Sequence, residues 1–274
     1  MLVRHERPIR CLLMGYNGTG NTGSDIRLLT AIDDVRAAFG EETSITIVSI
    51  DCERTESVIP SDERIQVVPF KLAPHKFIPS SYRLAWQHDV TILIEGSTFK
   101  QSWSPWLLHA YIWSAQHALW CGNYAVAYAV DVGDLTAFHA LCTRWIVNKM
   151  SLVMTRTEIA RKRLEDMGVK RPIIANTDTA FQYRGHVDSS PGPPAVGIAP
   201  VEFFHWPVQF KLWDRSENRY RWPFSFRWTP ERRQRSQDMV ENYVQLVRHI
   251  QNRHDLDVKL IAMEDVDAEV CERI

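Results

Sequence analysis

The stretch Cys11-Leu-Leu-Met-Gly-Tyr-Asn-Gly-Thr-Gly-Asn-Thr-Gly-Ser-Asp25 joins a short apolar run to a glycine-rich loop. The run 11–15 does not alternate apolar and polar residues, which is typical of a strand buried on both faces of a parallel sheet. The next segment, 25–39, has apolar residues at helical spacing, and Gly40 marks its end. A strand, a glycine loop and a helix in this order predict the first βα unit of an α/β domain.

The same alternation of strand and helix patterns continues through residues 1–187. Apolar or β-branched runs predict further strands at 44–50, 65–69, 90–95, 124–130, 152–155 and 173–175. Helical spacing predicts helices at 107–120, 135–150 and from Arg156 to Met167. We therefore predict a Rossmann-like α/β domain over 1–187, built on a doubly wound parallel sheet with right-handed crossovers.

A second, smaller unit is predicted after a composition change. Residues 188–194 are rich in Ser, Pro and Gly and are expected to be a linker. Beyond it, 195–274 predicts a partial second α/β domain with about one βαβ unit: strands at 195–199 and 258–262, helices at 233–252 and 266–274, and an aromatic-rich insertion. Such a unit is too small to close a sheet alone. Either it packs on the first sheet, or the sequence lacks the rest of this domain.

The composition excludes several classes of protein. The 274 residues have a formal net charge of −1, which gives no electrostatic footprint for bulk nucleic-acid binding. The five cysteines are scattered and no pair has CxxC spacing, so neither a disulfide framework nor a metal cluster is predicted. No secretory signal and no apolar run of about 20 residues are present, so a cytoplasmic location is the default expectation.

The loop Gly18-Thr-Gly-Asn-Thr-Gly23 matches the pattern G-x-G-x-x-G between a strand and a helix. Glycines let the backbone approach a ligand, and a helix N-terminus favours phosphate or carboxylate. The candidate substrate-binding residues here are Asn17, Gly18, Gly20, Asn21, Thr22, Gly23 and Asp25. Two alternatives stay open: a tight turn without a ligand, and a dinucleotide site in which Asp51, at the end of the second strand, holds a ribose.

Polar residues follow three other predicted strands, where open α/β sheets bind ligands. Glu95-Gly96-Ser97 and Asp178 are candidate substrate-binding residues. Arg156 is the third, because a guanidinium grips a carboxylate or phosphate with two hydrogen bonds. Thr155 and Glu158 have capping-box spacing, which predicts that Arg156 lies in the first turn of the following helix. Ordinary capping and surface pairing is the alternative for each.

Taken together, these segments resemble the polysaccharide pyruvyl transferase family. The resemblance runs in the correct order through 15–23, 94–97, 154–158 with the helix 161–168, 176–181 and 260–267. It implies a two-domain, GT-B-like fold and transfer of a pyruvyl group from phosphoenolpyruvate to a sugar as a ketal. The partners implied are phosphoenolpyruvate and a glycan or lipid-linked saccharide, without a cofactor. The family's N-domain arginine falls on Arg156, which the resemblance makes the catalytic arginine.

The chain departs from this family in three places. The glycine loop continues as Gly23-Ser-Asp25 instead of Gly-Asp-Glu, and the usual three-glycine turn is Glu95-Gly96-Ser97. The family's catalytic histidine lies beyond the last matched segment, so we expect the chain as given to lack that general acid. A dinucleotide-binding oxidoreductase and a catalytically degenerate binding subunit therefore remain alternatives.

Two other features have competing interpretations. His109, Trp113 and His117 share one helical face, and their spacing favours a packed stripe over a metal site. The insertion 203–228 interleaves aromatic residues with arginines. It is either an acceptor platform for sugar rings, with peripheral membrane contact as a variant, or a subunit interface in an oligomer or a loop that covers the sheet.

Overall fold

The computed structural model describes residues 7–71, 73–101, 104–185, 192–204, 208–211, 213, 219–221 and 224–274. The chain forms two compact units, Met1–Tyr183 and Arg184–Ile274. We call them the N-terminal unit and the C-terminal unit.

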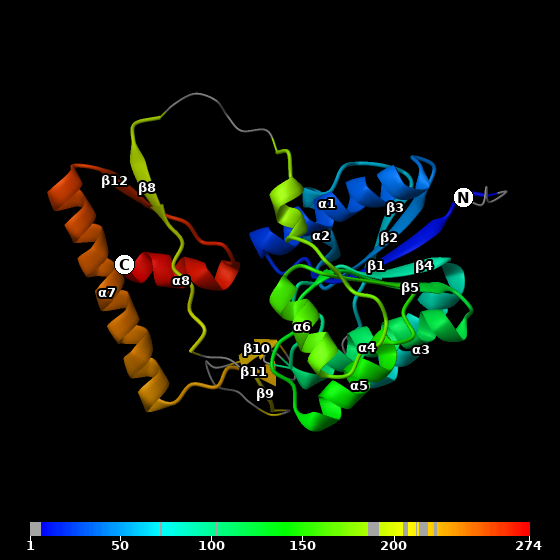
Figure 1. The fold of residues 1–274 in the computed structure, drawn as a ribbon. Helices are drawn as coiled ribbons and strands as arrows, with labels where there is room; N and C mark the ends of the chain where they lie inside the picture. The colour runs from blue at the N-terminus through cyan, green and yellow to red at the C-terminus, as the bar shows by residue number, and fades with distance from the viewer. Residues whose placement is uncertain are drawn as a thin grey trace. The chain divides into compact units, whose positions relative to one another are not determined.

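The N-terminal unit is built on a seven-stranded parallel sheet in the order β3-β2-β1-β4-β5-β6-β7 (Figure 1). The strands are β1 (Arg10–Asn17), β2 (Ser44–Ser49), β3 (Ile65–Pro69), β4 (Val90–Leu93), β5 (Tyr124–Val130), β6 (Leu152–Thr155) and β7 (Ile174–Ala175). The order reverses between β1 and β4, which is the switch point where open α/β sheets bind ligands. The predicted Rossmann-like fold is confirmed.

Helices cover both faces of this sheet (Figure 1). They are α1 (Thr22–Phe39), α2 (Cys52–Val58), α3 (Pro74–Gln87), α4 (Pro105–Trp120), α5 (Ala137–Val147), α6 (Glu158–Asp166) and the 3₁₀ helix η1 (Thr179–Gln182). Cys11 and Leu13 of β1 pack against α1, whereas the alternate residues Leu12 and Met14 belong to a second core with α3, α4, α5 and α6. This two-sided burial explains why the run 11–15 shows no alternation.

Three local differences from the sequence prediction have clear causes. Helix α1 begins at Thr22 instead of Asp25, because the side chain of Asn21 caps it by accepting a hydrogen bond from the Ser24 amide at 2.8 Å. Gly23 therefore belongs to the helix and not to the loop. Helices α2 and α3 were not predicted: α2 has only seven residues, and α3 contains Pro79, a residue that normally breaks a helix.

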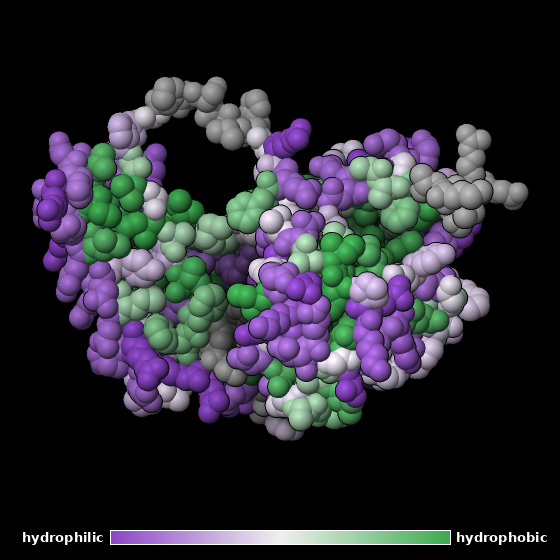
Figure 2. All heavy atoms as spheres, in the orientation of Figure 1, coloured by the Kyte–Doolittle hydropathy of each residue, from purple (hydrophilic) through white to green (hydrophobic). Residues whose placement is uncertain are grey.

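The C-terminal unit has a two-stranded parallel sheet of β8 (Ala195–Ile198) and β12 (Asp257–Leu260), with helices α7 (Pro230–His254) and α8 (Asp265–Arg273). Neither strand adds to the seven-stranded sheet. Hydrophobic side chains gather over β8 and β12, and hydrophilic ones line the outer edge of α7 (Figure 2). Among the described residues, no helix is long and apolar enough to cross a membrane.

The aromatic-rich insertion 203–228 contains a small antiparallel sheet that was not predicted. Its strands are β9 (Gln209–Phe210), β10 (Arg219–Arg221) and β11 (Phe224–Ser225). Phe203 and Trp213 are exposed. Residues 205–207, 212, 214–218, 222 and 223 lie outside the described residues, so the choice between acceptor platform and subunit interface stays a prediction.

Candidate functional site

The loops after β4 and β5 are joined edge to edge at the carboxyl end of the sheet. The Asp131 amide donates to the Gly96 carbonyl at 2.8 Å, and the Gly133 amide donates to the Phe99 carbonyl at 3.0 Å. Phe99 and Val132 also form a parallel bridge. These bonds fix the two loops relative to each other, so the side chains that they carry have a defined geometry.

Five charged side chains form a chain of ion pairs across this edge. Lys100 Nζ lies 2.7 Å from Asp131 Oδ2, which also accepts from Arg156 Nη2 at 2.8 Å. Arg156 Nη1 donates to Asp178 Oδ2 at 3.1 Å, and Arg27 Nε lies 3.5 Å from Asp178 Oδ1. Three cations thus face two carboxylates, which leaves one surplus positive charge in the chain of pairs.

The pKa values of the central pair follow from these contacts. Burial alone would raise the pKa of Asp131, but its hydrogen bonds from Lys100 and Arg156 lower it below the ordinary value. Burial alone would lower the pKa of Arg156, but Asp131 and then Asp178 raise it. Both groups are therefore charged throughout the physiological pH range.

Gly96 lies under the ends of two guanidinium groups. A Cβ atom at this position would be 2.2 Å from Arg27 Nη1 and 2.8 Å from Arg156 Nη1. Arg27 comes from the second turn of α1 and Arg156 from the end of β6, so the fold brings together two cations that are far apart in the sequence. Only glycine leaves room for both beside the backbone.

Arg27 is additionally anchored to a strained stretch of β5. Its Nη2 donates to the Ala129 carbonyl at 3.0 Å, and Ala129 has a φ of 49°. This left-handed conformation costs an alanine roughly 1–2 kcal/mol. The register between β5 and β6 shifts between Ala127 and Val130. Bulges and positive-φ residues of this kind concentrate at functional sites.

The glycine loop contains two left-handed glycines, Gly18 with φ 76° and Gly20 with φ 77°. The Asn17 side chain is buried and donates to the Val48 carbonyl at 2.9 Å, so it holds β1 to β2. Thr22, Gly23 and Asp25 lie in the first turn of α1, behind the Asn21 cap. Of the predicted loop residues, Asn17 and Asn21 thus have structural hydrogen bonds, whereas Gly18 and Gly20 shape the backbone.

Glu95 connects the end of β1 to the turn that follows β4. Its carboxylate accepts from the Tyr16 amide and from both the amide and the hydroxyl of Ser97, each at 3.2 Å. Tyr111 is completely buried, and its hydroxyl has no hydrogen-bond partner among the described residues. Burial, and next the charge of Glu95, raise the pKa of Tyr111 well above its ordinary value. The motif 95–97 therefore packs directly against the end of β1.

The predicted position of Arg156 was wrong. Helix α6 is capped by Thr157, whose hydroxyl accepts from the Ala160 amide at 3.0 Å, and Thr155 donates instead to the Thr157 carbonyl. Arg156 therefore precedes the helix and lies outside its first turn. This position leaves its guanidinium between Asp131 and Asp178 at the sheet edge.

Arg27, Lys100 and Asp131 were not among the residues expected from the sequence. Asp131 follows β5 directly, so the strand-end rule that selected Glu95 and Asp178 would have found it. Arg27 gave no such signal, because an arginine within an amphipathic helix is normally a surface residue. Asp178 caps η1 by accepting from the Ala180 amide at 3.1 Å and contacts both arginines as well.

Asp51 and the histidine stripe have local structural roles. Asp51 caps α2 by accepting from the Arg54 amide at 3.1 Å. His117 is buried and hydrogen-bonded to Ser81 at 2.9 Å, and His109 stacks edge-on against His139 with ring centroids 5.1 Å apart. No group of three or more metal-binding side chains occurs in the part of the chain that the structure describes. Trp113 also packs against His117, with ring centroids 5.6 Å apart, so these contacts of the stripe are packing contacts.

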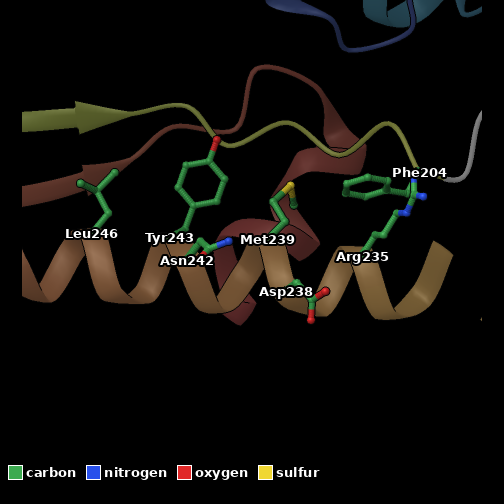
Figure 3. Close-up of a pocket in the computed structure, with 7 residues that line it drawn as sticks. All are labelled: Phe204, Arg235, Asp238, Met239, Asn242, Tyr243 and Leu246. Atoms are coloured by element: carbon green, nitrogen blue, oxygen red, sulfur yellow. The ribbon is translucent and has the colours of Figure 1, made fainter. Parts of the chain in front are cut away.

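The C-terminal unit has an open groove of about 480 Å³ along α7. Its lining residues are Phe204, Arg235, Asp238, Met239, Asn242, Tyr243 and Leu246. In Figure 3 the side chains of Arg235, Met239 and Tyr243 rise on the side of α7 that faces the segment containing Phe204, whereas Asp238 points away from that segment. The lining contains both apolar and polar side chains. No set of ion pairs like the one at the sheet edge of the N-terminal unit is found among these lining residues.

The fold is α/β, with a Rossmann-like parallel sheet, and belongs to the two-domain GT-B class. The solved structures that it resembles include a putative UDP-N-acetylglucosamine 2-epimerase from Listeria monocytogenes, with a TM-score of 0.53 and 13% identity, covering 98% of this chain and 65% of that chain. Another is S. aureus MnaA in a co-structure with UDP, with a TM-score of 0.55 and 11% identity, covering 98% and 66%. This chain thus spans slightly less than two thirds of their length.

No protein-family model matches the chain, and no curated protein matches it. At 11–13% identity, the likeness to the solved structures shows the fold alone. The site must therefore be interpreted from its own residues.

Proposed function

We propose that this chain is a transferase of glycan biosynthesis that binds an anionic donor at the carboxyl edge of its seven-stranded sheet. The observation that carries the proposal is the convergence of Arg27 and Arg156 over Gly96. Two guanidinium groups beside a glycine, which has no side chain to block a ligand, can bind a carboxylate or phosphate. The surplus positive charge of the ion-pair chain supports an anionic ligand as well.

The donor that we propose is phosphoenolpyruvate, with a pyruvyl group transferred to two hydroxyls of one sugar. Both hydroxyl oxygens would bond to the enol carbon, and the bond from this carbon to the phosphate oxygen would break. Of the two hydroxyl protons, one would go to the methylene carbon and the other would leave with inorganic phosphate. The segments that suggested this family are 15–23, 94–97, 154–158 with 161–168, 176–181 and, in the C-terminal unit, 260–267. Two contacts between these segments support the proposal: Glu95 accepts from the Tyr16 amide, and Arg156 donates to Asp178.

A UDP-sugar-binding enzyme is the second candidate. It is favoured by the similar structures, one of which is described as a UDP-N-acetylglucosamine 2-epimerase and another as a complex with UDP. The phosphates of a nucleotide present the same chemistry to Arg27 and Arg156 as phosphoenolpyruvate does. The dinucleotide alternative has less support, because the Asp51 carboxylate that would hold a ribose caps α2.

Calorimetry with separate titrations of phosphoenolpyruvate, UDP and NADH distinguishes these candidates. We expect phosphoenolpyruvate to bind, and Arg156→Ala to weaken binding by about tenfold or more, since a charge-assisted hydrogen bond contributes roughly 1.5–3 kcal/mol. Arg161→Ala is the matched control: Arg161 also pairs with two carboxylates and its side chain is 32% exposed, against 28% for Arg156.

Each result of these titrations has a definite meaning. Binding of UDP without phosphoenolpyruvate would replace the pyruvyl transferase proposal with the second candidate. Binding of NADH alone would favour the oxidoreductase. Equal affinity of the Arg156→Ala and wild-type proteins for phosphoenolpyruvate would contradict the role of Arg156.

A further inference from the structure

We propose that Arg27 and Arg156 form one clamp for a single carboxylate or phosphate group, and that Asp178 occupies this clamp in the ligand-free protein. The inference rests on the proposed function and adds to it a second binding residue and an internal competitor. The role of Arg27 does not follow from the motifs in the sequence, because Arg27 lies outside all of them. Asp178 was expected from the sequence as a substrate-binding residue and not as a competitor.

The geometry makes the two arginines a pair. Their Nη1 atoms both lie within 3 Å of the position that a Cβ atom on Gly96 would occupy, at 2.2 Å and 2.8 Å. Both contact the carboxylate of Asp178, Arg156 through Oδ2 at 3.1 Å and Arg27 through Oδ1 at 3.5 Å. One carboxylate therefore already spans the two guanidinium groups, as a ligand oxyanion would.

The side chain of Arg27 is more deeply buried than that of an ordinary surface arginine. Its side chain is 8% exposed, and a guanidinium in such a position needs an anion beside it. Its Nε has no hydrogen-bond partner among the described residues, because the 3.5 Å contact with Asp178 is an ion pair without the alignment of a hydrogen bond. Such a buried donor is unsatisfied, and an oxyanion aligned with Nε would give it the hydrogen bond that it lacks.

Asp178 is suited to be exchanged for a ligand. Its side chain is 24% exposed, and it stands at the start of the four-residue helix η1. One of its oxygens also caps η1, which an uncharged asparagine could do equally well. Asp131, by contrast, holds Arg156 from the other side and pairs with Lys100, so it stays in place when a ligand arrives.

A matched pair of residues on the same helix provides the control. Arg36 is also a poorly exposed arginine of α1, at 15%, and it is ion-paired with Asp62. This pair lies at the other end of α1, away from Gly96. Variants at Arg36 and Asp62 therefore reproduce the loss of an arginine–aspartate pair without touching the proposed clamp.

The experiment measures Kd by calorimetry for phosphoenolpyruvate, pyruvate, inorganic phosphate and UDP. Arg27→Lys keeps the charge but loses the fork of donors, so we expect Kd to rise about tenfold or more. Asp178→Asn removes the competitor, so we expect Kd to fall about threefold or more. Arg36→Lys and Asp62→Asn should leave Kd unchanged. A preference for pyruvate over phosphate would assign the clamp to the carboxylate, and the reverse to the phosphate.

The failure of this inference differs from the failure of the proposed function. If wild type binds none of the four probes, the proposed function fails. If wild type binds but Arg27→Lys binds equally well, Arg27 is structural and the clamp is overturned. If Asp178→Asn weakens binding, Asp178 is a ligand contact and not a competitor. Circular dichroism shows whether the Arg27→Lys variant is folded. If it is not, the affinity of the Asp178→Asn variant alone tests the inference: tighter binding supports the clamp, and weaker binding contradicts it.

Discussion

Arg156 donates a hydrogen bond from Nη2 to Oδ2 of Asp131 at 2.8 Å, and this contact joins the ends of the neighbouring strands β6 and β5. The same Asp131 oxygen lies 2.7 Å from Lys100 Nζ. Asp131 thus sets where the guanidinium of Arg156 stands, although it was not among the residues expected from the sequence. Its removal should affect both stability and ligand binding.

Asp131→Asn is expected to lower the free energy of unfolding by about 1–3 kcal/mol at neutral pH, because two cations lose a half-buried partner. The pKa of Asp131 is depressed in the folded protein, so its contribution is present above its ordinary pKa and is lost as pH falls through the folded value. The difference in unfolding free energy from wild type should therefore shrink below about pH 4. Chemical denaturation across pH 3–7 measures it.

Asp134→Asn is the control for this series. The Asp134 side chain is 99% exposed and lies 3.4 Å from Arg163, so its removal should change stability by less than about 0.5 kcal/mol. An Asp131 variant as stable as the Asp134 variant would show that the ion-pair chain does not stabilise the sheet edge.

Gly96→Ala tests the space beneath the two guanidinium groups. The added methyl would meet the flexible ends of Arg27 and Arg156, which can shift, so we expect the fold to survive. The arginines would no longer converge, and affinity for the anionic donor should fall about tenfold or more. Calorimetry together with thermal melting separates the two effects. Gly192→Ala, where a Cβ would meet nothing within 4 Å, should leave affinity unchanged; an equal effect in both variants would contradict the assignment of the site.

The sequence predicted the fold well because the central strands β1, β2 and β4 are buried on both faces. A uniform apolar run such as 11–15 indicates a buried strand whatever lies beside it, although β1 extends beyond this run to Arg10 and Asn17. The predicted bounds of β3, β5 and β6 were correct. The site was predicted only in part. Arg156 and Asp178 follow strands and could be selected by position, but no local pattern shows that Arg27 of α1 reaches Asp178. That contact depends on how η1 packs beside α1.

The capping of α6 shows a second limit of sequence reasoning. Thr155 and Thr157 are both good N-cap residues, and capping-box spacing favoured Thr155. The structure uses Thr157, because Thr155 completes β6 and pairs with Val130 of β5. Strand pairing, which is a tertiary interaction, thus decided between two local patterns of similar strength. The two-residue difference moved Arg156 from the helix into the site.

Gly18→Ala should be strongly destabilising, for two separable reasons. Gly18 has a φ of 76°, and a Cβ there would lie 2.5 Å from the Asp51 carbonyl oxygen, which is backbone and cannot move away easily. Gly122 has nearly the same φ, 75°, but a Cβ there would meet nothing within 4 Å. Gly122→Ala should cost about 1–2 kcal/mol from conformation alone. Gly18→Ala should cost at least about 1 kcal/mol more. Similar unfolding free energies for the two variants would show that the loop does not pack against Asp51.

Cys11 provides a chemical test of the central strand. It is fully buried in β1, and burial, with a smaller effect from Asp89, raises the pKa of its thiol to about 12. Because the thiolate is the reactive form, Cys11 should resist a thiol reagent in the folded protein at about pH 8. The other four cysteines are partly exposed. Four thiols per chain should therefore react with the reagent in the native protein, and five in the denatured protein. In Cys11→Ala the native count should stay at four and the denatured count fall to four. Rapid reaction of five thiols in native wild type would show that β1 is not buried at the centre of the sheet.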